Sequence, residues 1–68
     1  MMFVVDSQMF GRDIKAKALS NYTYQILDDK DNVIDTIQLT YKEAHDEEGR
    51  YFVVEQDKFN KIMQYVKR

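Results

Sequence analysis

The sequence predicts an α+β domain: a small antiparallel β-meander of four to five strands with one C-terminal amphipathic helix packed on a face. Two observations support this prediction. Short segments in which apolar and polar residues alternate fill most of the chain, with the two-residue period of half-buried strands. Only the last segment changes to the spacing of an amphipathic helix. An SH3-like or OB-like half-barrel would use the same strands and is the alternative.

The chain is expected to form a single domain, residues 1–68. Its length is near the lower limit for a hydrophobic core without other support. It has no cysteine, which excludes disulfides and thiolate zinc sites. Apolar residues make up 44% of the chain, which is typical of a folded domain rather than a disordered one. A homodimer would bury further surface, so both a monomer and a homodimer are compatible with this size.

The N-terminal part is expected to form two strands. The run Met1–Val5 is apolar on both faces, which predicts a strand lying centrally in a sheet or under the helix. A connection is expected at Ser7–Gly11. In Asp13–Leu19 apolar residues alternate with Lys15 and Lys17, which favours a strand; a helix is the alternative, since alanine and lysine are good helix formers.

The middle of the chain predicts a β-hairpin. Tyr22–Leu27 alternates and is rich in strand formers, Asp28–Asn32 is a polar turn cluster, and Val33–Tyr41 alternates again. The highly charged stretch Lys42–Arg50 is expected to be a loop.

The C-terminal part predicts a strand and then the helix. The strand is Tyr51–Glu55, and the helix is Asp57–Lys67, with Asp57 as its N-cap. One apolar stripe follows helical spacing and consists of Phe59, Ile62, Met63 and Val66. We expect this stripe to cover the inward positions of the hairpin, namely Tyr22, Tyr24, Ile26, Ile37 and Leu39.

The sequence gives no support for an enzyme, a cofactor or a metal site. Its one histidine, His45, lies among acidic residues, and neither serine is in the sequence context of a nucleophile. Asp29, Asp31 and Asp35 resemble part of a calcium loop, but the required glycine and closing glutamate are missing, so turn formation explains them better. A core this small is not expected to enclose a ligand cavity of about 300 Å³.

The N-terminal apolar run also bears on location. It is too short to span a membrane and lacks the basic start and the cleavage site of a signal peptide. We therefore expect a cytoplasmic protein that does not bind a membrane.

The leading functional hypothesis is a non-enzymatic binding protein that modulates or inhibits a protein partner by stoichiometric surface occlusion. Acidic loops suit a basic partner surface, and tyrosine is enriched at interfaces. The residues expected to bind the partner are Asp28, Asp29, Asp31, Glu47, Glu48 and Tyr65. The composition (short, without cysteine or proline, rich in tyrosine, aspartate and lysine) resembles that of small accessory proteins of phages and mobile elements.

The alternative is a small nucleic-acid-binding β-domain. Its basic residues would be Lys15, Lys17, Lys42 and Arg50, of which the first two would share a sheet face with polar neighbours. The net charge of −2 offers no basic excess for phosphate binding, so nucleic acid is the less expected partner.

Overall fold

A computed structural model describes residues 1–44 and 48–67 and confirms the α+β class, with antiparallel strands and a C-terminal helix. The described residues form no closed barrel. The elements in chain order are β1 (Met2–Asp6), α1 (Met9–Arg12), β2 (Ala16–Ala18), β3 (Thr23–Leu27), β4 (Val33–Gln38), β5 (Tyr51–Glu55) and α2 (Gln56–Met63).

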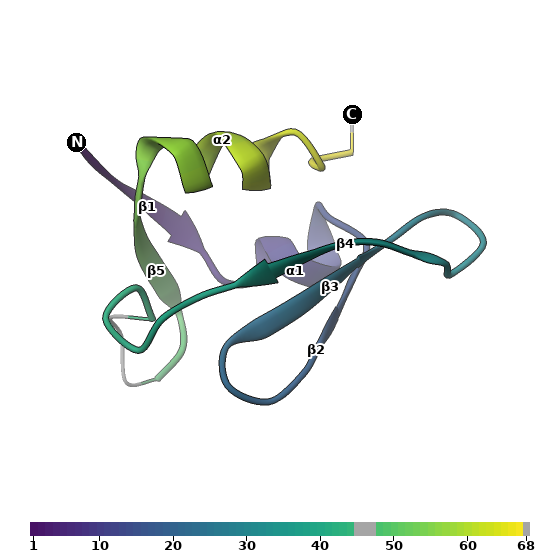
Figure 1. Ribbon diagram of the computed structural model, residues 1–68, viewed down its shortest axis with the longest axis horizontal. Helices are drawn as coiled ribbons and strands as arrows, with labels where there is room; N and C mark the ends of the chain where they lie inside the picture. The colour runs from purple at the N-terminus through teal and green to yellow at the C-terminus, as the bar shows by residue number, and fades with distance from the viewer. Residues whose placement is uncertain (45–47, 68) are drawn as a thin grey trace.

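The strands of the described residues belong to two sheets (Figure 1). β2, β3 and β4 form an antiparallel meander, as the alternating patterns predict. β1 instead pairs antiparallel with β5, which joins the two ends of the chain in a separate two-stranded sheet. The first strand therefore does not lie at the centre of a sheet.

The hairpin forms from local turn chemistry. The carboxylate of Asp28 accepts the backbone N–H groups of Lys30 and Asn32, and Asp31 adopts a positive φ of 66°. β4 ends at Gln38 rather than continuing to Tyr41, and Leu39 then donates its backbone N–H to the Tyr22 carbonyl.

The stretch between β1 and β3 combines a predicted and an unpredicted element. The strand interpretation of residues 13–19 is confirmed, although β2 covers only Ala16–Ala18. The expected connection after β1 contains the short helical segment α1, which is interrupted at Gly11 with φ 109°. Glycine adopts this backbone conformation without steric cost.

α2 is shorter than predicted, and its cap is different. Asp57 is not the N-cap; Glu55 holds that position without a side-chain capping bond, and the Asp57 carboxylate accepts the N–H of Lys58 inside the first turn. The helix ends at Met63 because the following residues form a tighter turn, in which the backbone N–H of Val66 donates to the Met63 carbonyl. The backbone N–H of Lys67 then donates to the Asp13 carbonyl, outside the helix.

A single core joins both sheets and α2. Its buried residues are Val5, Ile14, Ile26, Ile37, Leu39, Ala44, Phe52, Val54 and Ile62. α2 packs on β1 and β5, where Phe59 stacks on Phe3 with ring centroids 4.5 Å apart. The first strand thus lies under the helix, which was the second of the two placements that the sequence predicts for it.

The predicted contact of the helix stripe with the hairpin tyrosines is wrong. Tyr24 stacks on Phe10 of α1, with ring centroids 4.2 Å apart. Tyr22 is 42% exposed, because Asn21 and Tyr22 both have positive φ and extend the turn that precedes β3. The aliphatic positions of the hairpin, by contrast, do share the core with Ile62.

Candidate protein-binding surface

The β1–β5 sheet buries one face and leaves the other open. Phe52 and Val54 point into the core, together with Val5 of β1. The alternate residues of the two strands point away from the core. We call this opposite side the outer face; it consists of Met2, Val4, Asp6, Tyr51, Val53 and Glu55.

The centre of the outer face is apolar. Val4 pairs directly with Val53 and is 66% exposed, and Met2 is 55% exposed. Contiguous exposed apolar surface on a small protein commonly marks an interaction site. The sequence contained the signal for this face, since Met1–Val5 is apolar on both sides, but the second side is open instead of buried within the domain.

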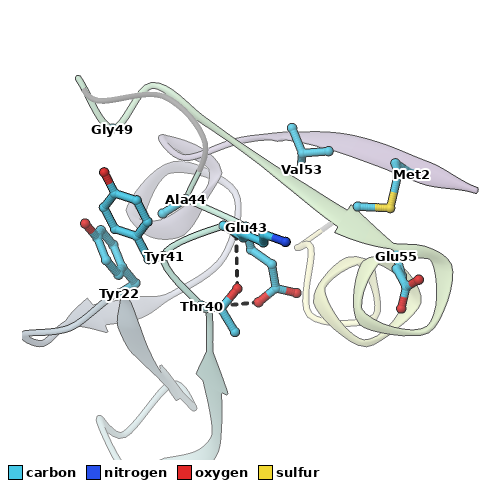
Figure 2. Close-up of a pocket in the computed structure, with 10 residues that line it drawn as sticks. Met2, Tyr22, Thr40, Tyr41, Glu43, Ala44, Gly49, Val53 and Glu55 are labelled. Atoms are coloured by element: carbon cyan, nitrogen blue, oxygen red, sulfur yellow. Dashed lines mark hydrogen bonds between the residues drawn. The ribbon is translucent and has the colours of Figure 1, made fainter.

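An open hollow of about 730 Å³ adjoins the outer face (Figure 2). Its lining residues are Met2, Tyr22, Thr40, Tyr41, Lys42, Glu43, Ala44, Gly49, Val53 and Glu55. The chain does not need a large core to form it, because the hollow lies on the surface between the outer face and the segment that follows β4. The expectation that so small a domain offers no ligand-sized space therefore applies to enclosed cavities and not to this hollow.

Two tyrosines form the wall of the hollow opposite Met2 and Val53 (Figure 2). The rings of Tyr22 and Tyr41 meet edge to face with centroids 6.2 Å apart, and the two residues are 42% and 75% exposed. Exposed tyrosines supply apolar area together with a polar tip, which suits a protein interface.

The segment beside the hollow is fixed by a reciprocal polar contact. The carboxylate of Glu43 accepts the N–H of Thr40 at 2.7 Å, and the Thr40 hydroxyl accepts the N–H of Glu43 at 3.1 Å. Lys58 of α2 binds the same carboxylate at 2.7 Å. Burial acts to raise the pKa of Glu43, but the bonds from Lys58 and Thr40 outweigh it, and the pKa is lowered. These contacts hold the wall of the hollow to the helix.

The acidic turn predicted to bind a partner is engaged within the chain. Asp28 accepts backbone N–H groups of the turn, chiefly that of Asn32, and these bonds lower its pKa. Asp31 lies 2.7 Å from the ammonium of Lys15, and Asp29 lies 3.1 Å from that of Lys67. The hydrogen bond with Asp31 raises the pKa of Lys15. Asp28 thus has a structural role in the turn, whereas Asp29 and Asp31 form exposed ion pairs, which contribute little to stability.

The remaining predicted partner-binding residues are dispersed. Glu47 lies outside the described residues, as does His45. Glu48 lies 3.3 Å from the guanidinium of Arg50. The hydroxyl of Tyr65 donates to the carboxylate of Asp35, which raises the pKa of Tyr65 and lowers that of Asp35.

The predicted basic residues do not form one continuous track. Lys17 shares a row with Gln25 and Thr36, as the strand interpretation requires. Lys15 is paired with an aspartate of the hairpin turn, whereas Lys42 lines the hollow. Of the predicted lysine-bearing sheet face, the structure therefore shows only the row of Lys17, Gln25 and Thr36.

Other kinds of site are not indicated in the part of the chain that the structure describes. Residues 1–44 and 48–67 contain no group of three or more metal-ligating side chains suited to a metal ion. No helix among them has the length and apolar character needed to cross a membrane. Comparison with protein-family models, curated proteins and solved structures finds no match for this chain.

Proposed function

We propose that this chain is a non-enzymatic binding protein of the cytoplasm, which inhibits or modulates a protein partner by covering part of its surface in a stoichiometric complex. The observation that supports this proposal is the open, apolar outer face of the β1–β5 sheet. A chain of this size normally needs its apolar residues for its core. Leaving Met2 and Val4 exposed therefore favours a second protein that covers them.

The proposal moves the binding site away from the acidic turn. Asp28 and Asp31 are engaged with their own chain, and charges on exposed loops contribute to association rate more than to affinity. The outer face has the composition of an interface centre, apolar and aromatic, with carboxylates only at its ends.

Affinity capture with matched variants tests this function. The tagged protein, its Val4→Lys variant and its Ile34→Lys variant are used as baits in lysate of the source organism, with and without nuclease treatment. Ile34 is 54% exposed and belongs to the other sheet, so it is a matched control for Val4. We expect one protein to be retained by the wild type and by Ile34→Lys, and to be lost with Val4→Lys.

The captured protein is then purified and mixed with the wild type to measure stoichiometry by sedimentation. Capture that Val4→Lys does not change would contradict the proposed surface. Capture that nuclease removes would instead favour nucleic acid as the ligand.

A further inference from the structure

Strand β1 has an unpaired edge within the described residues. In an antiparallel pair, directly opposite residues alternate between hydrogen-bonded and non-hydrogen-bonded pairs. Val53 donates its N–H to the Glu43 carbonyl at 2.8 Å, on the side of β5 away from β1. Its opposite residue, Val4, must then direct its N–H and C=O away from β5. By the two-residue period, Met2 and Asp6 do the same.

Within the described part of the chain, β1 has β5 as its only strand neighbour. Exposed edges are usually protected by lysine, proline, a bulge or shortness. β1 is five residues long, pairs in regular register and is apolar from Met2 to Val5. This edge is therefore suited to accept an added strand.

The charges around this edge indicate what that strand contains. Asp6 lies at one end of the apolar row and Glu55 lies at the other end, opposite Met2. In the described part of the structure, the Glu55 side chain makes no ion pair and no capping hydrogen bond. The Asp6 carboxylate accepts the N–H of Gln8 at 2.9 Å, and its one ion pair is a 3.4 Å contact with Arg12, whose side chain is 55% exposed. A strand with apolar residues over Met2 and Val4, and with basic residues at both ends, would complement this pattern.

A second copy of this chain complements the edge less well. Symmetric antiparallel pairing of two β1 strands about Val4 would place Asp6 of one copy opposite Met2 of the other. That carboxylate would lie two strand spacings, about 10 Å, from Glu55. The dimer would contain this like-charged pair twice, and its two carboxylates would repel each other.

We propose that β1 binds an extended segment of the partner protein by strand addition, and that this segment has alternating apolar residues flanked by lysine or arginine. The inference rests on the proposed function, because it specifies how a protein partner meets the outer face. Backbone hydrogen bonds to Met2, Val4 and Asp6 provide affinity, and the flanking charges provide selectivity.

Peptide titration of the isotope-labelled protein tests the proposal. The probe is a blocked synthetic peptide of alternating valine and threonine with lysines at both ends, and the readout is the amide NMR shifts. We expect shifts at Met2, Val4 and Asp6, and binding about tenfold tighter than for the same peptide with glutamate ends. N-methylation of the valines, whose N–H groups would face β1, should abolish binding. N-methylation of the threonines should be tolerated.

Two charge variants provide the matched control. Glu55→Lys should reduce or reverse the preference for the lysine-flanked peptide. Asp29→Lys, at the distant hairpin turn, should leave the preference unchanged (Figure 1). Both substitutions are at exposed positions, where a change of side chain is expected to have little effect on stability.

Three results would overturn the inference. Shifts confined to Tyr22, Tyr41 and Val53 would place the peptide in the hollow, and equal binding of both peptides would remove the charge selectivity. Amide shifts of β1 that depend on protein concentration, without peptide, would identify a second copy as the occupant. None of these three results decides the proposed function, which is tested separately by whether Val4→Lys prevents capture of the partner.

Discussion

At the scale of single residues, the polar side chains of this protein mostly stabilise local backbone. Asp28 is the clearest example, since one carboxylate oxygen accepts the N–H groups of Lys30 and Asn32 at 2.8 and 2.9 Å. A cluster of aspartates in a short, acidic chain invites a functional interpretation. The contacts indicate that the hairpin turn needs this carboxylate, irrespective of any partner.

The acid stability of the protein should depend on Asp28. Its pKa is lower in the folded chain than in the unfolded one, so its contribution is complete above the unfolded pKa, near 3.9. The contribution is lost as the pH falls through the lower folded value. Below about pH 4, we expect the unfolding free energy of Asp28→Asn to fall less steeply than that of the wild type. Urea denaturation of both proteins at a series of pH values measures this difference.

Asp29→Asn is the matched control for this prediction. The Asp29 carboxylate is paired with Lys67 and accepts no backbone N–H among the described contacts. If Asp28→Asn and wild type lose stability in parallel as the pH falls, the role assigned to the Asp28 carboxylate is wrong.

At the scale of elements, α2 is held through one fully buried side chain. Ile62 is 0% exposed and contacts the common core, so truncation would leave a cavity. Ile62→Ala should cost about 2–5 kcal/mol of unfolding free energy, whereas Ile34→Ala, at a 54% exposed position, should cost within about 0.5 kcal/mol. Urea denaturation of both variants measures the difference. Similar costs at the two positions would contradict the assigned core.

The elements also show what the sequence can and cannot predict. The hairpin of β3 and β4 follows from local alternation and turn residues, and the choice of strand for residues 13–19 follows from the alternation with Lys15 and Lys17. The pairing of β1 with β5 is not local. It joins segments almost fifty positions apart, such as Val4 and Val53, and no periodic pattern specifies which strands meet.

The candidate site was less predictable than the fold for the same reason. The apolar character of both faces of Met1–Val5 is visible in the sequence, but the side left open depends on where β5 and α2 lie. The hollow likewise requires Tyr22 and Tyr41 to meet at the end of β4. Alternation alone predicts that Tyr22 faces the core, because it gives no sign of the positive φ at residues 21 and 22.

At the scale of the whole molecule, two small sheets and one helix share a single core, and only one face of the β1–β5 sheet contributes to it. The described residues extend over 32 × 23 × 17 Å. So small a body offers few surfaces large enough for a specific complex. The outer face, with the adjoining hollow, combines exposed apolar side chains with tyrosines, which is why we assign the partner to it.

Methyl cross-saturation NMR of the protein in complex with its captured partner tests this assignment most directly. The account predicts that the methyl signals of Met2, Val4 and Val53 lose intensity, while those of Val33 and Ile34 beside the acidic turn do not. Loss of intensity at Val33 and Ile34, with the methyl groups of the outer face unaffected, would contradict it and return the binding site to the turn.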